Sequence, residues 1–440
     1  MAIFTRRRIQ AMLNDLRPLL DGNKRADLVA RLNNKRVEQA LPAEMELALV
    51  WAMKDFDCLE VEPDWWVNGK KPDAYVEGLL PDRPAVVEIA STNDNSISGE
   101  QLMDRCSQTI VAHANAVKKG FGDYLYFQFA ETTEIERGIR MRGIAAPRNY
   151  VLSDAAKALI KEWVLSNNEP VQRLRIEESG LCVEIEKKNY KQIRYHNFWT
   201  TRPPRVYSET DNPIYNVLSQ KLSQIDGAPE GTYRIIFLSE IGSRTLDELG
   251  APFPNVVERN ATAEKIIRRF LSDKKGRVDA VVVFVPKKDY QSFSQETQRS
   301  WKAVVFWDDE APGLLDSLRK IEATLPLPRF TGSQARSLFR QGAFAPEGRG
   351  WYGGVSMTST GSDITYRMSS RALQDFLAGR ITEDQFRHFI GDADNGPTVG
   401  RFLDQGFMIS EISFEKGNVD EDDDTLVLRF TKDPAAHSFE

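Results

Sequence analysis

The alternation of hydrophobic and polar positions divides the first third of the chain into a helical segment and an α/β segment. Apolar residues recur every three or four positions through the first forty residues, which predicts an N-terminal helical segment over 1–40. A helix is expected over 43–53, because Pro42 is favoured in a first helical turn. The elements expected after it are strands at 59–62, 74–77 and 85–90, a helix over 99–119 and a strand over 124–129. This order predicts one α/β layer around a small mixed sheet.

The rest of the chain predicts two further units. Strands at 233–238, 278–285 and 303–307 are continuous apolar runs, which indicates burial on both faces and a second α/β unit over 211–328. Residues 329–440 combine a loop rich in glycine, serine and threonine with two helices and a hairpin that turns at Asp420–Asp424, so a small α+β module is expected there. The predicted fold class is α/β, with helices flanking a mixed sheet.

Composition narrows this picture by exclusion. No run of 18 apolar residues is present, so no membrane-spanning helix is expected. Three widely spaced cysteines and four histidines argue against a structural zinc site and indicate reduced thiols, which favours a cytoplasmic protein. The formal net charge is −6, so any contact with nucleic acid must come from a local basic patch.

Three acidic positions are candidates for chemistry. Glu88 lies inside the apolar strand 85–90, where a carboxylate is costly unless it is paired or binds a metal. Asp73 starts the preceding strand, and a hairpin between the two strands would bring it close to Glu88. A carboxylate from the preceding helix, Glu46 or alternatively Glu44, would complete an oxygen-ligand site for Mg²⁺ or Mn²⁺.

These residues also carry a family resemblance. Pro72-Asp73, followed fifteen residues later by Glu88-x-Ala90, resembles the motif of the PD-(D/E)XK nucleases. The order of predicted elements resembles the αβββαβ core of that restriction-endonuclease-like superfamily, so a nuclease-like domain is expected over 41–210. The resemblance implies that Asp73, Glu88 and Glu46 are metal ligands and catalytic acids, that Mg²⁺ (or Mn²⁺) is the cofactor, and that DNA is the substrate.

Ala90 departs from the family pattern. The family has a lysine there, which positions the nucleophile and stabilises the transition state, and a methyl group can do neither. Some relatives carry the cation on the next helix or on a neighbouring strand. Lys71 is the candidate assigned to the site, and the other candidates are Lys70, Arg105 and Gln108. Alternatively the site is inactive, Glu88 simply pairs with Lys71 or Arg105, and the fold is a binding scaffold.

A second candidate region is the basic and aromatic segment 187–205, which holds six lysines and arginines. Cations contact phosphates, and exposed aromatic rings stack on unpaired bases. The candidate nucleic-acid-binding residues are Lys187, Lys188, Lys191, Arg194, Trp199 and Arg202. The alternative is a basic strand edge whose aromatic side chains lie in the core.

The sequence thus predicts a metal-dependent DNA endonuclease of the bacterial restriction or anti-phage defence type. The second hypothesis is a catalytically inactive nuclease fold that binds nucleic acid or a protein partner as a subunit of a defence complex.

Overall fold

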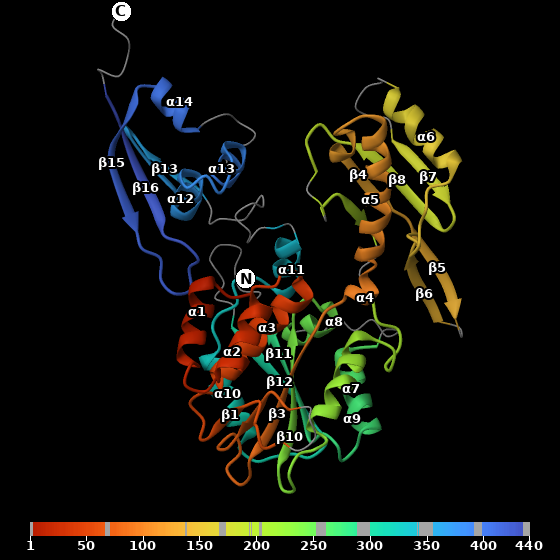
Figure 1. Ribbon diagram of the computed structural model, residues 1–440, viewed down its shortest axis with the longest axis vertical. Coiled ribbons are helices and arrows are strands. Elements are labelled where there is room, and N and C mark those ends of the chain that lie inside the picture. Colours follow the sequence, from red (N-terminus) through yellow and green to blue (C-terminus); the bar gives the residue numbers. More distant parts are fainter. Residues whose placement is uncertain are drawn as a thin grey trace, which may run out of the picture.

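The computed structural model describes residues 3–66, 71–136, 139–166, 173–192, 194, 196–201, 205–251, 261–287, 300–340, 342, 355–390 and 398–433. The fold is mixed α/β, with several sheets flanked by helices (Figure 1), which confirms the predicted class at that level. No helix among these residues is long and apolar enough to cross a bilayer.

One six-stranded mixed sheet forms the body of the molecule. Its strands, in spatial order, are β1 (Leu59–Val61), β2 (Ala74–Val76), β3 (Ala85–Thr92), β10 (Tyr233–Glu240), β11 (Ala280–Pro286) and β12 (Trp301–Trp307). Strands β3, β10 and β11 are parallel neighbours, and the other pairings are antiparallel. The central strands are almost wholly buried, as their continuous apolar runs require.

Helices cover both faces of this sheet. One face packs against α1 (Arg6–Asp15), α2 (Gly22–Leu32), α3 (Val37–Ala52) and α10 (Leu314–Thr324). The other face packs against α7 (Pro213–Ile225) and α9 (Ala263–Asp273). Side chains of β3 alternate between the two cores, with Val87 and Ile89 in the first and Val86 and Ala90 in the second. Helix α3 begins at Val37 instead of residue 43, so Pro42 lies inside the helix.

The structure places the domain boundaries differently from the sequence prediction. The expected units 41–210 and 211–328 share one sheet, because β10 pairs with β3 over its full length, from Tyr233 opposite Ala85 to Glu240 opposite Thr92. The boundary at 329 also shifts, since α11 (Gly332–Arg340) packs on the body through Ala335. Two short helices of the body, α8 (Arg244–Asp247) and η2 (Glu248–Gly250), follow β10.

The described residues between 95 and 200 form a separate lobe, inserted between β3 and α7 (Figure 1). Its four-stranded sheet has the order β7 (Leu174–Glu178), β8 (Leu181–Lys187), β4 (Leu125–Phe129) and β9 (Phe198–Thr200). The lobe also contains α4 (Asn95–Ser98), α5 (Glu100–Val117), η1 (Phe121–Tyr124), α6 (Asp154–Leu165) and the two-stranded ribbon of β5 (Glu131–Glu136) and β6 (Ile139–Ile144). The lobe has its own core around Phe127 and Ile160. The helix and the strand expected at 99–119 and 124–129 are therefore formed, but both belong to the inserted lobe and not to the six-stranded sheet.

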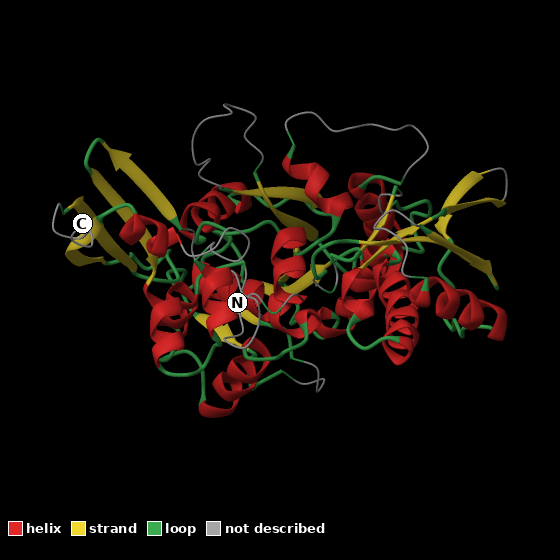
Figure 2. Ribbon diagram, turned by 90° about the horizontal axis from the view of Figure 1, so that it is seen from above, coloured by secondary structure: helices red, strands yellow, loops and turns green. Residues whose placement is uncertain are grey.

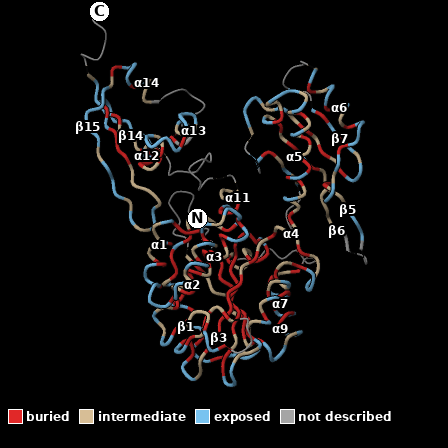
Figure 3. Tube along the Cα trace, in the orientation of Figure 1, coloured by how far each residue is buried: buried red, intermediate tan, exposed pale blue. Residues whose placement is uncertain are grey.

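The C-terminal α+β module also has a core of its own, centred on Tyr366 and Phe430. Its antiparallel sheet has the order β13 (Ser356–Thr360), β14 (Asp363–Ser369), β16 (Thr425–Lys432) and β15 (Phe407–Glu415). Its helices are α12 (Ser370–Leu377), α13 (Glu383–Phe389) and α14 (Thr398–Asp404). The module and the inserted lobe both extend from the same end of the body, the module to the left and the lobe to the right in Figures 1 and 2. Buried residues are concentrated in the body, whereas β15 is largely exposed (Figure 3).

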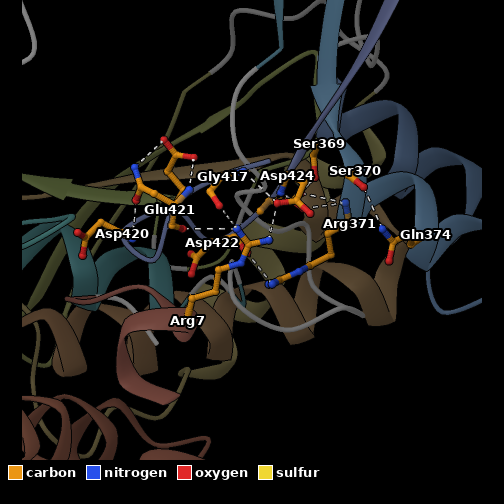
Figure 4. A network of polar contacts seen from close by, with 12 residues as sticks. Arg7, Ser369, Ser370, Arg371, Gln374, Gly417, Asp420, Glu421, Asp422 and Asp424 are labelled. Atoms are coloured by element: carbon orange, nitrogen blue, oxygen red, sulfur yellow. Dashed lines mark hydrogen bonds and ion pairs between the residues drawn. The ribbon is translucent and has the colours of Figure 1, made fainter. Parts of the chain in front are cut away.

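Polar contacts fasten the C-terminal module to the body at the turn between β15 and β16 (Figure 4). Arg8 Nε and a terminal guanidinium nitrogen donate to Asp420 at 2.8 and 2.7 Å, and Arg7 donates to Asp424 Oδ1 at 2.6 Å. The backbone N–H of Arg6, in the first turn of α1, donates to Asp422 Oδ1 at 2.7 Å. We call Asp420–Asp424 the acidic turn. Because these groups are partly exposed, salt should weaken the attachment.

Replacing Arg7 and Arg8 together by glutamine should therefore loosen the module without unfolding it. We expect a larger radius of gyration in small-angle X-ray scattering for this variant in low salt, and a similar increase for the wild type on raising the salt concentration. The matched control is Arg380→Gln, which removes an arginine that pairs with Asp375 inside the module. Unchanged scattering of the double variant at all salt concentrations would contradict the polar attachment.

Candidate active site

The pairing of β2 with β3 brings together two of the predicted acidic residues. Ala74 lies opposite Val87, so Asp73 and Glu88 meet at the beginning of β2. The backbone N–H of Asp73 donates to Glu88 Oε2 at 3.2 Å, and Asp73 Oδ2 accepts from the N–H of Ile89 at 2.6 Å. Glu88 is completely buried. The two carboxylates are thus held by the backbone of the same hairpin.

Lys221, which is not among the residues predicted from the sequence, supplies the positive charge. Its Nζ donates to Glu88 Oε1 and lies 3.8 Å from Asp73 Oδ2. It extends from α7, which begins behind an Asn212 cap with Pro213 in its first turn. A signal for it exists in the sequence: Lys221 stands three residues after Leu218 and four before Ile225, on the apolar stripe that α7 turns to the sheet. A lysine on such a stripe requires a buried partner.

The two candidates for the third acid have different surroundings. Glu44 is buried and accepts from the backbone N–H groups of Ile3 and Phe4 at 2.9 and 3.2 Å, so it anchors the start of the chain. Glu46 accepts two hydrogen bonds from Arg31 of α2, at 2.5 and 2.7 Å, and its charge contributes to raising the pKa of Asp73. Glu46 is therefore the acid beside the site, but Arg31 holds its carboxylate.

The structure does not bring Lys71 to the site. Its ammonium pairs with the exposed carboxylate of Asp64, while Lys221 takes the position beside Glu88. Arg105 and Gln108 lie on α5 in the inserted lobe, and Lys70 lies outside the described residues. The prediction that Lys71 provides the cation is therefore wrong. The cation beside Glu88 is Lys221, which lies 133 residues further along the chain.

The buried carboxylates carry more negative charge than Lys221 balances. Burial raises the pKa of Asp73 to about 6, and the charge of Glu46 adds to this effect. Burial and the charge of Asp73 raise the pKa of Glu88 well above its usual value. Burial by itself would lower the pKa of Lys221, but the carboxylates of Asp73 and Glu88 raise it. The site is an electrostatically costly cluster, which is typical of functional sites.

The donor set and its charge fit a hard divalent cation. Asp73 and Glu88 provide carboxylate oxygens, and Mg²⁺ is commonly held by one or two carboxylates with water and phosphate oxygens in its other positions. Among the described residues, no three acidic, histidine or cysteine side chains are grouped as a ready metal site. Asp73 and Glu88 would therefore hold the ion, while Glu46 would act on it through its charge.

Most of the predicted nucleic-acid-binding cations are engaged within the inserted lobe. Arg194 donates to both carboxylate oxygens of Asp104 at 3.2 and 2.9 Å, and Lys188 donates to Glu186 at 2.8 Å. Of the other predicted cations, Lys187 lies over the ring of Phe121 and Lys191 lies 3.9 Å from Asp123. Arg202 is outside the described residues. These pairings favour the structural alternative, a basic strand edge, although Trp199 is exposed on β9.

Comparisons of the chain with protein-family models, with curated proteins and with solved structures return no match.

Neutralising Asp73 should stabilise the protein at high pH. Because the folded-state pKa is raised to about 6, the folded state binds the proton more tightly than the unfolded state, and stability falls as pH rises from about 4 to 6. We expect Asp73→Asn to raise the free energy of unfolding by roughly 1–3 kcal/mol at pH 8, with a smaller gain at pH 5. Urea denaturation at the two pH values measures this difference.

The control is Asp64→Asn, since Asp64 is an exposed acid near the site. It should change stability by no more than about 0.5 kcal/mol at either pH. A loss of stability in Asp73→Asn at pH 8 would contradict the charge imbalance.

Proposed function

We propose that this chain is a Mg²⁺-dependent endonuclease of the PD-(D/E)XK type, acting on DNA, in which Lys221 replaces the motif lysine. The observation that carries the proposal is the contact of one lysine with both motif carboxylates, Glu88 and Asp73. The residue at the motif position, Ala90, packs instead in the core under α7.

The order of elements supports the proposal once the inserted lobe is set aside. Helix α3 and strands β1, β2 and β3 are followed, after the lobe, by α7 and β10. This succession is αβββαβ, with β10 next to β3 in the sheet. In this succession α7 is the helix that follows the motif strand β3. Some members of the family carry the displaced cation on that helix.

Each site residue then has a defined role. Asp73 and Glu88 would hold the Mg²⁺ ion, which would supply water activation and neutralise charge on the scissile phosphate. The Lys221 ammonium lies beside both carboxylates and is positioned to donate hydrogen bonds to a phosphate oxygen or to the attacking water. Arg31 holds the Glu46 carboxylate through two hydrogen bonds, so Glu46 contributes negative charge to the site.

A second function is favoured by the same ion pair. Lys221 neutralises part of the charge on Glu88, and no third ligand converges with the pair among the described residues. In that case the domain is a catalytically inactive scaffold that binds nucleic acid or a protein partner. For either function we propose a cytoplasmic role in restriction or phage defence, which follows from the family resemblance and the sparse cysteines.

The enzyme hypothesis predicts metal-dependent cutting of plasmid or single-stranded DNA by the purified protein. Asp73→Asn and Glu88→Gln should abolish cutting, because each removes a metal ligand. Lys221→Met should reduce the rate by about 10²–10³-fold, the range for loss of one donor to the transition state, and Lys221→Arg should retain part of the rate. The matched control is Lys265→Met, an exposed lysine on α9.

One outcome would contradict the assignment of the site, and another would favour the scaffold over the enzyme. Cutting that persists in both Asp73→Asn and Glu88→Gln would contradict the site. Absence of cutting by the wild type with Mg²⁺ and with Mn²⁺, together with metal-independent retention of DNA that salt weakens, would support the scaffold instead.

A further inference from the structure

A cleft of about 510 Å³ lies at the carboxyl ends of β3 and β10, apart from the candidate active site. Its walls come from the turns after the two strands, from α4 and α8, from β9 of the inserted lobe and from α11. Figure 1 places α4, α8 and α11 at this same end of the sheet. The volume is within the range of small-molecule binding sites. The body and the inserted lobe thus build the cleft together.

Two glycines allow the close packing that forms its floor. A Cβ atom on Gly332 would lie 2.3 Å from the backbone nitrogen of Gly242, so α11 can approach the end of β10 only without a side chain there. Gly242 has a φ of 116°, and a Cβ atom on it would lie 2.7 Å from Cδ of Arg336. The N–H of Asp94 donates to the carbonyl of Gly242 at 3.0 Å, which joins the two turns. Arg336 is therefore held at the floor by fixed backbone.

The cleft is lined by three arginines, Arg244, Arg336 and Arg340, and by three carboxylates, Asp94, Glu100 and Asp247, so the charges of its lining are matched in number. Arg336 is 7% exposed and donates a hydrogen bond to Asn95 Oδ1. A carboxylate oxygen of Glu38 lies 3.9 Å from Arg336 and 3.3 Å from Arg340. Burial and the nearby charge of Arg340 lower the pKa of Arg336 to about 10. Arg244 is exposed at the cleft, and its guanidinium makes no hydrogen bond or ion pair with the part of the chain that the structure describes.

The other lining groups limit what kind of anion would fit. Ser333 and Ser337 line the cleft beside the arginines, and the Ser337 hydroxyl lies 3.1 Å from His196 Nε2. Phe198 of β9 also lines the cleft, and its ring is partly buried against the core of the inserted lobe. Three carboxylates also line the cleft. Asp94 accepts from the N–H of Arg244 at 2.8 Å, Glu100 pairs with Arg340, and Asp247 lies on α8, three residues after Arg244. Carboxylates disfavour a bare multivalent anion, but they accept hydrogen bonds from the N–H groups of a nucleobase.

We propose that this cleft binds a nucleotide, with the phosphate on Arg336 and Arg244 and the base against Phe198. Guanidinium groups match phosphate geometry, and aromatic rings stack on bases of any sequence. The nucleotide could be free or could be the phosphorylated end of a strand, since both present the same chemistry. The site does not depend on the proposed nuclease function, because Asp73, Glu88 and Lys221 are not part of its lining.

Calorimetric titration of the full chain tests the proposal with five probes: inorganic phosphate, adenosine monophosphate, guanosine monophosphate, a short 5′-phosphorylated single-stranded oligonucleotide, and the same oligonucleotide without its phosphate. We expect a phosphate-bearing nucleotide to bind more tightly than inorganic phosphate. Arg336→Gln and Arg244→Gln should each weaken that binding at least tenfold. Arg244→Gln is the decisive variant, because the exposed arginine can be removed without disturbing the floor of the cleft. The control is Arg268→Gln on the exposed face of α9.

The probes separate the two sources of the ligand. Binding of the monophosphates indicates a free nucleotide, whereas binding of the phosphorylated oligonucleotide alone indicates a strand end. The proposal is overturned if no nucleotide binds at millimolar concentration, if inorganic phosphate binds equally well, or if Arg244→Gln binds like the wild type. Nucleotide binding should persist in Asp73→Asn, so failure of the metal site and failure of the cleft are distinguishable.

Discussion

The parallel pairing of β10 with β3 joins stretches of chain that the inserted lobe separates in sequence. Every residue from Ala85 to Thr92 has a partner between Tyr233 and Glu240, and both strands are almost wholly buried. Helix α7 immediately precedes β10 and covers the β3 face that carries Glu88. The candidate active site therefore depends on this pairing, because the same register that closes the sheet brings Lys221 to Glu88.

Part of the site could be predicted from sequence because its signals are local. Glu88 stands out as a charge within an apolar strand, and a simple hairpin brings Asp73 beside it. Lys221 could not be assigned in this way, since nothing in the local pattern shows which strand α7 will cover. Its position on the apolar stripe of α7 marks it as a lysine with a buried partner, but it does not identify that partner.

The predicted domain boundaries at 41–210 and 211–328 were wrong for a related reason. Periodicity correctly indicated that β10 and β11 are buried on both faces, but it does not specify the neighbouring strand. The helix and strand that follow β3 in sequence, α5 and β4, form as expected and have their own apolar core. An insertion that folds on its own core carries no sequence mark that distinguishes it from a continuation of the first sheet. The C-terminal hairpin was predictable, since both strands and the acidic turn are local.

A double-mutant cycle between Lys221→Met and Glu88→Gln tests most directly whether these two residues form one site. At pH 8, Lys221→Met should cost about 3 kcal/mol of unfolding free energy, because it leaves buried carboxylates without their cation. In the Glu88→Gln background the same change should cost at least about 1.5 kcal/mol less, the coupling expected of residues in direct contact. Equal costs in the two backgrounds, within about 0.5 kcal/mol, would show that Lys221 and Glu88 act independently and would contradict the account.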